Sequence, residues 1–318
     1  MTLSLDPHPV FAGSSGPVLV VVADGVGIAP DAPSNAVTQA STPTLDALLG
    51  SDLSTQLTAH GTAVGLPTND DMGNSEVGHN AIGAGRIFAQ GAKLVNQALE
   101  SGSIFGTDVW GEAISHGRSG TLHFIGLHSD GNVHSHINHL HQLMERAAHD
   151  GVTRIRLHLL LDGRDTPPRS ALEYIQQTEM TIAEINESHD ADIRIGSGGG
   201  RMTITMDRYE ADWNMVQQGY NCHTHGIGRP FTSASEAIET LYSESDKGDQ
   251  YLEPFVITDT DEQPVGTISD GDAVILFNFR GDRAIEISQA FEDAEFDKFD
   301  RGNAPNVFFA GMLQYDGD

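Results

Sequence analysis

The sequence has few basic residues and a single cysteine. Its 318 residues include 45 Asp and Glu but only 17 Lys and Arg, which gives a formal net charge of −28. A surface with so few cations cannot displace the counterions of nucleic acid or bind an anionic membrane, so both partners are excluded. Because Cys222 has no second cysteine with which to pair, no internal disulfide framework exists, and we expect a reducing compartment.

Long apolar runs are also missing. No stretch approaches the roughly 20 apolar residues of a membrane helix. Residues 1–17 lack the basic start and apolar centre of a secretory signal. We therefore expect a soluble, cytoplasmic protein. Its length exceeds the roughly 150 residues typical of one domain, so two domains are expected.

Short apolar runs recur along the chain, and each ends in polar, glycine-rich sequence. The runs span Val18–Ala23, Leu122–Gly126, Ile155–Leu161, Ile193–Ile195 and Ala273–Phe279. Such continuous runs indicate strands buried on both faces of a mostly parallel sheet. Helical patterns lie between them, with expected starts at Thr42-Pro43 (ending at Gly50), Ser135, Ser170 and Ser233 or Ser235. The alternation predicts an α/β architecture, in which ligands gather at the carboxyl ends of strands.

Ser75 lies among acidic and small residues in the segment DDMGNSEVGH, before an apolar stretch. One interpretation is a serine that caps a helix, with Glu76 nearby. The other is a hydroxyl nucleophile at a helix N-terminus, where backbone N–H groups favour an incoming phosphate. No G-x-S-x-G elbow surrounds Ser75, which disfavours acyl transfer. Asp24, directly after the first predicted strand, is either a turn former or a metal ligand that activates such a hydroxyl.

Five arginines follow or adjoin the predicted strand ends. They are Arg164, Arg201, Arg208, Arg280 and Arg283. Guanidinium groups bind carboxylate and phosphate through two parallel hydrogen bonds, so together they point to a small, multiply anionic substrate. Surface ion pairing is the alternative for any one of them. Among the nearby histidines, His139 and His141 cannot face the same side of a helix, whereas His134 lies in a loop and has the better claim to chemistry.

Several segments together resemble the cofactor-independent phosphoglycerate mutases. They read VVVADGVGIAP, NDDMGNSEVGHNAIGAGRIFAQGAKLV, GLHSDGNVHSHINHL, LLLDGRD, SGGGRMTITMDRYEADW and FNFRGDR. The resemblance covers nearly the whole chain from Pro17 onward. It implies an α/β protein in which part of an alkaline-phosphatase-like sheet domain, residues 1–91, precedes an inserted α/β transferase domain, residues 92–318.

The resemblance also implies functions for individual residues. Ser75 matches the metal-bound nucleophile that takes the phosphoryl group from 3-phosphoglycerate, and Asp24 matches a ligand of one of two divalent ions, with Mn²⁺ expected and Mg²⁺ or Co²⁺ as alternatives. Asp165 matches the residue that moves protons on the glycerate hydroxyls. The residues that match the phosphoglycerate-binding set are His134, Arg164, Asp165, Arg201, Arg208, Arg280 and Arg283.

The family's remaining metal ligands match nothing in this sequence. We therefore expect either a truncated sequence or a second polypeptide that completes the site, and otherwise a monomer. The implied function is interconversion of 3-phosphoglycerate and 2-phosphoglycerate through a phosphoserine, with a chain that is inactive alone. Two alternatives are a metal-dependent phosphomonoesterase or sulfatase on the same scaffold and a non-catalytic fragment that binds phosphoglycerate.

Overall fold

The computed structural model describes residues 8–23 and 25–315. By its internal contacts the chain divides into two units, Met1–Leu57 and Thr58–Asp318. Each unit is described by itself. The domain boundary predicted after residue 91 stays a prediction. None of the helices within the described residues is long and apolar enough to cross a membrane.

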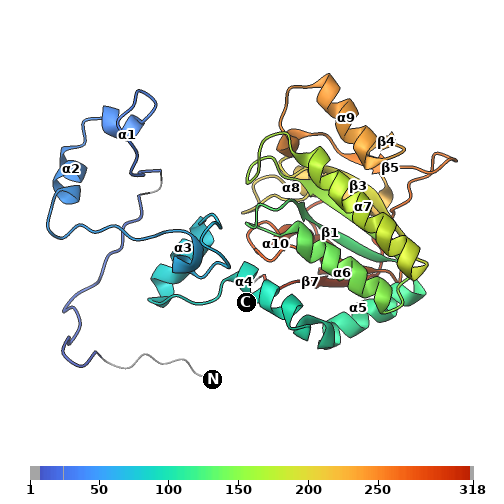
Figure 1. Ribbon diagram of the computed structural model, residues 1–318, viewed down its shortest axis with the longest axis horizontal. Helices are drawn as coiled ribbons and strands as arrows, with labels where there is room; N and C mark the ends of the chain where they lie inside the picture. Colours follow the sequence, from blue (N-terminus) through green and yellow to red (C-terminus); the bar gives the residue numbers. More distant parts are fainter. Residues whose placement is uncertain (1–7, 24, 316–318) are drawn as a thin grey trace. The chain divides into compact units, whose positions relative to one another are not determined.

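The first unit contains two short helices, α1 (Ala36–Gln39) and α2 (Pro43–Leu49), and neither buries a side chain (Figure 1). The predicted start at Pro43 and end at Gly50 are confirmed, because Pro43 stands in the first turn and Gly50 caps the last. The buried strand predicted over Val18–Ala23 is wrong. The side chains from Val18 to Val22 are between 51% and 84% exposed, and the described residues provide no partner strand to pair with this run.

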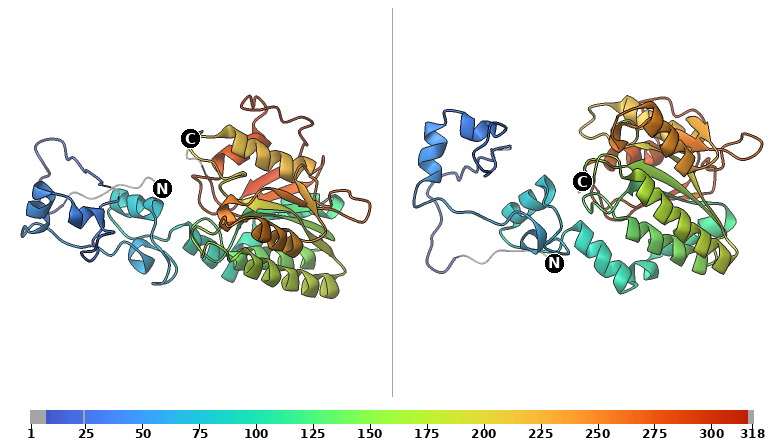
Figure 2. Two further views of the ribbon diagram at one scale, coloured as in Figure 1. Left: turned by 90° about the horizontal axis from the view of Figure 1, so that it is seen from above. Right: turned by 45° about the horizontal axis from the view of Figure 1, so that its top comes forward.

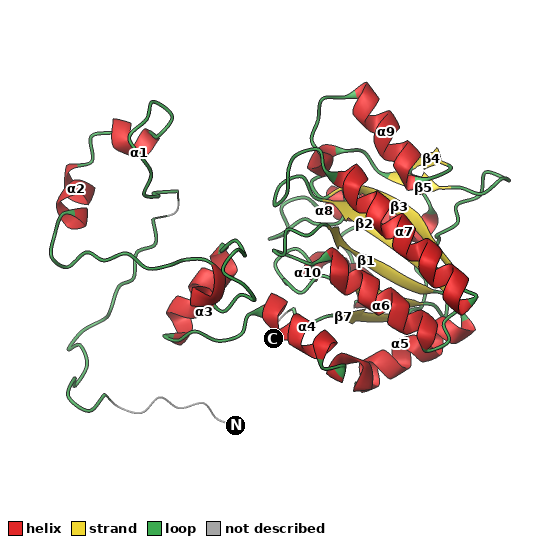
Figure 3. Cartoon of the chain, viewed as in Figure 1, coloured by secondary structure: helices red, strands yellow, loops and turns green. Residues whose placement is uncertain are grey.

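The second unit is built on a seven-stranded sheet (Figure 3). The strands are β1 (Leu122–His128), β2 (Arg154–Leu161), β3 (Asp192–Gly200), β4 (Arg229–Phe231), β5 (Phe255–Ile257), β6 (Ala273–Leu276) and β7 (Phe308–Gly311). Their order is β4-β5-β3-β2-β1-β6-β7. All neighbours are parallel except β3 and β5, so the α/β prediction is confirmed.

Helices cover both faces of this sheet (Figure 2). The helices packed on the sheet are α4 (Gly91–Glu100), α5 (Asp108–Ser119), α6 (Ile137–His149), α7 (Ala171–His189), α8 (Trp213–His225), α9 (Ala234–Glu244) and α10 (Ile285–Glu292). The helix α3 (Ser75–Ala84) packs instead against the 3₁₀ turn at Gly61–Val64, and further 3₁₀ turns span Ser103–Gly106 and Asp249–Tyr251. Phe124 belongs to the core formed with α4–α7 and α9, whereas Ile125 belongs to the core formed with α8 and α10. Consecutive strand residues thus fill opposite cores, as the alternation of side chains along a strand requires.

The predicted helix starts were right for α7 and α9 and wrong for α6. Ser170 and Ser233 stand at the N-caps of α7 and α9. At α6 the cap is His136, whose Nδ1 lies 3.1 Å from the backbone nitrogen of Asn138. Ser135 does not cap the helix, because its hydroxyl donates instead to the carbonyl of Leu127.

The strand order indicates where a ligand of this fold would bind. From β1 the chain proceeds through β2 to β3 on one side of β1, and it later returns through β6 to β7 on the other side. Connections that leave in opposite directions open a crevice outside the carboxyl ends of β1 and β6. The predicted site residues follow these strand ends.

Candidate functional site

Four neighbouring strands deliver the predicted side chains to one edge of the sheet. His134 follows β1, Arg164 and Asp165 follow β2, Arg201 follows β3, and Arg280 with Arg283 follows β6. Because β3, β2, β1 and β6 are adjacent and parallel, their carboxyl ends lie side by side. Sequence segments more than a hundred residues apart therefore meet here.

Asp282 lies at the centre of the cluster. Its Oδ2 lies 3.0 Å from Arg280 Nη2 and 3.5 Å from Arg208 Nη1, and its Oδ1 lies 3.7 Å from His134 Nδ1. One carboxylate therefore brings together three of the predicted residues. The sequence analysis did not assign Asp282 to the site, although its position between Arg280 and Arg283 in the segment RGDR was a usable signal.

Arg201 is fixed by two further carboxylates. Its Nη1 lies 2.9 Å from Asp162 Oδ1 and 2.5 Å from Asp165 Oδ2, and the residue is only 2% exposed. Asp162 is also held by Ser129, whose hydroxyl donates to it at 2.6 Å, and by the backbone amides of residues 164 and 165. Asp162 was likewise missed from sequence. A buried arginine paired on one side in this way keeps its guanidinium in a single orientation.

The five guanidinium groups lie close enough to act on one another. The pKa of His134 is held well below 6.5 by burial and by the charges of Arg201, Arg280, Arg283 and Arg164. Burial, together with the charges of Arg208, Arg201 and Arg164, lowers the pKa of Arg283 to about 10. Like charges this close raise each other's free energy, and a bound anion would relieve that repulsion. The structure thus brings all five predicted arginines close together, whereas their role in binding a ligand stays a prediction.

His134 has an unused ring nitrogen in this site. The imidazole is 3% exposed, and its Nδ1 has no hydrogen-bond partner among the described residues. Its lowered pKa means that the ring is neutral at ordinary pH. A neutral, buried imidazole beside several guanidinium groups can exchange a hydrogen bond with a ligand without adding charge.

Ser75 lies beside the same arginines. It is the first residue of α3, and the cap is Asn74, whose side chain accepts a hydrogen bond from the Val77 backbone at 3.2 Å. The alternative that Ser75 caps this helix is therefore wrong. The Ser75 hydroxyl instead lies 3.4 Å from Arg280 Nη2, while Arg280 Nε lies 3.0 Å from Glu76 Oε2. Arg280 links the serine to Asp282 and the arginine cluster.

The predicted metal ligands, Asp24 and Ser75, stay a prediction, because only Ser75 lies within the described residues. Asp24 lies outside them. Within the described part of the chain, no group of three or more His, Cys, Asp or Glu side chains is arranged to hold a metal ion. The helix histidines have other neighbours, because His139 Nε2 contacts Asn96 and His141 Nε2 lies 2.9 Å from the Thr178 hydroxyl.

A chain of buried hydrogen bonds reaches the site through the sheet. Thr205 Oγ1 lies 3.0 Å from His223 Nε2, and His223 Nδ1 lies 2.8 Å from Ser197 Oγ. Ser197 Oγ in turn lies 2.7 Å from His158 Nδ1, and His158 Nε2 lies 3.0 Å from His123 Nδ1. Burial lowers the pKa of His223 to about 3, so its ring is neutral and donates from one nitrogen while it accepts at the other. This series of hydrogen bonds ends at Thr205, at the start of the loop that leads to Arg208.

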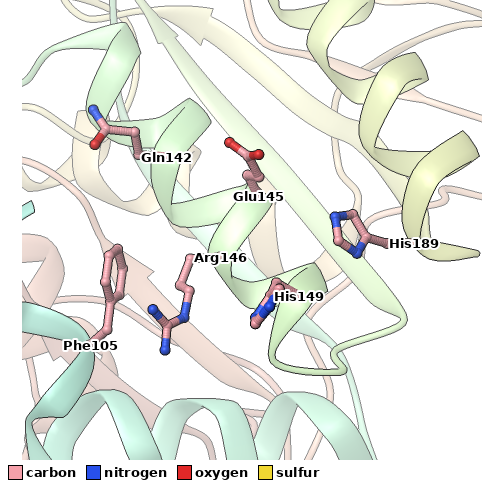
Figure 4. A pocket seen from close by; sticks show the side chains of 6 residues that line it. All are labelled: Phe105, Gln142, Glu145, Arg146, His149 and His189. Carbon is pink, nitrogen blue, oxygen red and sulfur yellow. The ribbon is translucent and has the colours of Figure 1, made fainter. Parts of the chain in front are cut away.

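A hollow lined by other residues lies at the C-terminal ends of α6 and α7 (Figure 4). Its lining residues are Phe105, Gln142, Glu145, Arg146, His149 and His189. Arg146 is already engaged, since its Nε lies 2.9 Å from Asp150 and its guanidinium stacks over the ring of Phe105. Nothing in this hollow converges as the strand-end arginines do.

Comparisons with known proteins show which family this chain is similar to. A family described as the BPG-independent PGAM N-terminus matches residues 95–317. A probable 2,3-bisphosphoglycerate-independent phosphoglycerate mutase from Leptospira interrogans is 55% identical over 306 residues, which cover 95% of this chain and 56% of the relative. The corresponding mutase from Trypanosoma brucei is 51% identical and aligns with 100% of this chain and 58% of its own length.

Among solved structures, Leishmania mexicana phosphoglycerate mutase at low cobalt concentration matches with a TM-score of 0.88 and 48% identity. The match covers 92% of this chain and 54% of that one. The chain thus spans little more than half the length of the relatives that it matches.

Proposed function

The chain belongs to the 2,3-bisphosphoglycerate-independent phosphoglycerate mutase family, and we propose that its strand-end cluster grips 3-phosphoglycerate and 2-phosphoglycerate for their interconversion. The observation that carries the proposal is the convergence of five guanidinium groups and a neutral His134 at adjacent strand ends. Phosphoglycerate has a phosphate on one carbon and a carboxylate on another, and each anion suits a two-pronged guanidinium contact.

In the proposed reaction Ser75 receives the phosphoryl group. The Ser75 hydroxyl gives up its proton and its oxygen forms a bond to phosphorus, while the bond from phosphorus to the glycerate 3-oxygen breaks and the 3-oxygen takes up a proton. Glycerate then turns within the arginine cluster. Its 2-hydroxyl gives up its proton as its oxygen takes the phosphoryl group back, the bond from phosphorus to Ser75 breaks, and the Ser75 oxygen takes up a proton. Asp165, fixed by Arg201 at 2.5 Å, is the group proposed to move protons between the two glycerate hydroxyls.

The family resemblance adds two divalent ions, and a related Leishmania structure was determined with cobalt. Such an ion would lower the pKa of the serine hydroxyl and stabilise charge on the phosphoryl oxygens. The described residues do not fit a complete metal site, because they lack a group of three suitable side chains. We therefore assign no step to a metal. Asp24 and Ser75 remain the proposed ligands, with Mn²⁺ the proposed ion and Mg²⁺ or Co²⁺ the alternatives.

Calorimetric titration with 3-phosphoglycerate, glycerate and inorganic phosphate tests the proposed ligand. A site that holds both anionic ends should bind 3-phosphoglycerate more tightly than either fragment, because each end adds charge-assisted contacts. If phosphate alone binds as tightly as 3-phosphoglycerate, the glycerate-gripping role is wrong. Release of phosphate from p-nitrophenyl phosphate would instead support the phosphomonoesterase alternative.

A turnover assay addresses the fragment alternative. We expect the 318-residue chain with added Mn²⁺ to form no more 2-phosphoglycerate than its Ser75→Ala variant, because two candidate ligands are fewer than a stable metal site needs. Turnover well above that control would show that these residues suffice. A cytoplasmic location and a monomeric state, or a partner chain that completes the site, remain part of the proposal.

A further inference from the structure

The loop that carries Arg208 has a strained backbone. Thr205, Tyr209 and Glu210 have φ angles of 67°, 62° and 56°, in the left-handed region that residues other than glycine rarely adopt. Such conformations persist only where surrounding contacts hold them. Arg208 lies between them and reaches Asp282 at 3.5 Å. Whatever fastens this loop therefore also places one of the five arginines.

Glu286, in the first turn of α10, is the fastening at the far end of the loop. Its Oε1 accepts a hydrogen bond from the backbone nitrogen of Glu210 at 2.9 Å, and the residue is only 4% exposed. Nearer the other end, Arg283 donates to the carbonyl of Met206, and the Thr205 hydroxyl contacts His223. Glu286 is the only one of these fastenings that ends in a carboxyl group.

The second oxygen of Glu286 faces another acid. Oε2 is buried and has no hydrogen-bond partner among the described residues. Asp207, itself 6% exposed, acts on Glu286 through its charge, and its own Oδ2 accepts from the Asp212 backbone at 2.5 Å. Two buried carboxyl groups whose charges act on each other are stabilised when one of them is protonated, because two negative charges there would repel.

No neighbouring cation neutralises Glu286 in the described structure. Arg283 is turned to the Met206 carbonyl, and Lys298 pairs with the Glu210 carboxylate at 3.1 Å. On α8, which packs against α10, His223 contacts Thr205 and Ser197, and His225 contacts the carbonyl of Arg301. Burial first, and then the charges of Asp207 and Glu210, raise the pKa of Glu286 to about 7.

We propose that Glu286 is a positioning residue: its protonated carboxyl donates to Asp207, accepts from the Glu210 backbone, and so clamps the Thr205–Glu210 loop with Arg208 in the anion site. The proposal rests on the proposed function only for the identity of the ligand. The clamp has a defined pH dependence. Its stabilising contribution is fully present below 4.5, the ordinary pKa, and is lost as the pH rises through about 7, where Glu286 ionises beside Asp207.

Three variants test the clamp in the full chain. In Glu286→Gln the amide accepts from Glu210 and donates to Asp207 at every pH, so it imitates the protonated acid. Asp207→Asn removes the repelling charge and donates to ionised Glu286. The control is Glu292→Gln, a change of the same type on the same helix, where burial alone raises the pKa of Glu292.

Affinity for 3-phosphoglycerate is measured by calorimetry at pH 6 and pH 8. At pH 6, wild-type and Glu292→Gln should bind as tightly as Glu286→Gln and Asp207→Asn. At pH 8, wild-type and Glu292→Gln should bind about tenfold more weakly than Glu286→Gln and Asp207→Asn, because only about a tenth of Glu286 is still protonated at that pH. The variants are compared with one another at the same pH, so the change in the phosphate charge of 3-phosphoglycerate between pH 6 and pH 8 affects all of them equally. A ratio of wild-type to Glu286→Gln affinity that is the same at both pH values overturns the clamp.

Hydrogen–deuterium exchange of the peptide 205–212 separates the clamp from the ligand. Relative to Glu286→Gln, the wild-type loop should lose about tenfold in protection between pH 6 and pH 8. If wild-type fails to bind 3-phosphoglycerate at either pH but shows this loss, the proposed function is wrong and the clamp stands. Equal protection in wild-type and Glu286→Gln at both pH values removes the clamp whatever binds.

Discussion

Similar apolar runs are exposed in the first unit of the chain and buried in the second. The run from Val18 to Val22 is between 51% and 84% exposed, whereas every residue of β1 is buried. Both runs have the continuous apolar character of a strand buried on two faces. The difference lies in their neighbours, since β1 is paired on both sides by β2 and β6.

The comparison shows that an apolar run specifies a strand only when partner strands are present. A strand satisfies its backbone N–H and C=O groups through its neighbours, and its side chains are buried by helices packed on the sheet. β1 has both kinds of partner, and the described residues provide neither for Val18–Val22. The predictions below set matched changes in the two regions against each other.

Limited proteolysis should separate the regions by the largest factor. Neither α1 nor α2 buries a side chain, so residues 8–57 open at little free-energy cost, whereas the sheet opens only on unfolding. We expect cleavage in residues 8–57 to be at least about a hundredfold faster than in the sheet, with a stable core that begins near Gly91. Mass spectrometry of the fragments over time measures this. Digestion of both regions at equal rates would remove the distinction.

Truncation of one leucine in each region is the next test. Leu122→Ala, in a β1 residue with no exposed surface, should lower the free energy of unfolding by about 2–5 kcal/mol. Leu19→Ala, at a residue that is 84% exposed, should change it by no more than about 0.5 kcal/mol. Urea denaturation followed by tryptophan fluorescence gives both values. A large loss in Leu19→Ala would mean that the Val18–Val22 run is buried in solution.

Two helical glycines give a smaller contrast within the second unit. A Cβ on Gly219 of α8 would lie 2.7 Å from the Thr205 backbone nitrogen, so Gly219→Ala should displace the strained loop and cost about 1–3 kcal/mol. Gly111 of α5 faces open space, and Gly111→Ala should stabilise the protein by about 0.5–1 kcal/mol. Thermal unfolding of both variants decides, and a neutral Gly219→Ala would show that the loop does not press on α8.

The fold was predictable where each element packs against partners among the described residues. The strand patterns near Leu122, Ile155, Ile193 and Ala273 each correspond to a strand of the sheet. The short strands β4, β5 and β7 were not predicted, because three or four residues at a sheet edge give little periodicity. The run at Val18 misled because periodicity cannot reveal whether a partner exists.

The arginines of the candidate site could be predicted from the sequence, whereas its acidic side chains could not. An acidic chain of this composition has few arginines, so those at strand ends stand out, and all five converge. Asp162, Asp282 and Glu286 were missed because they are three among 45 acidic residues. Which acids turn inward depends on tertiary packing, and only the structure shows that these are buried or contact an arginine or a loop.

The central claim is that the strand-end arginines form one anion site, and titration of Arg283→Ala with 3-phosphoglycerate tests it most directly. Arg283 is 6% exposed, and the charges of Arg208, Arg201 and Arg164 act on it. Loss of a charge-assisted contact worth roughly 1.5–3 kcal/mol should weaken binding by a factor of about ten to a hundred. Arg283→Lys should recover only part, because an ammonium cannot make the planar two-pronged contact.

Arg229→Ala is the matched control, because Arg229 pairs with Glu244 and Glu253 at the surface and should leave affinity unchanged. Circular dichroism at the titration temperature confirms that each variant is folded. The account predicts a loss of affinity in Arg283→Ala, a partial loss in Arg283→Lys and none in Arg229→Ala. Equal affinity of wild-type and Arg283→Ala for 3-phosphoglycerate would contradict it.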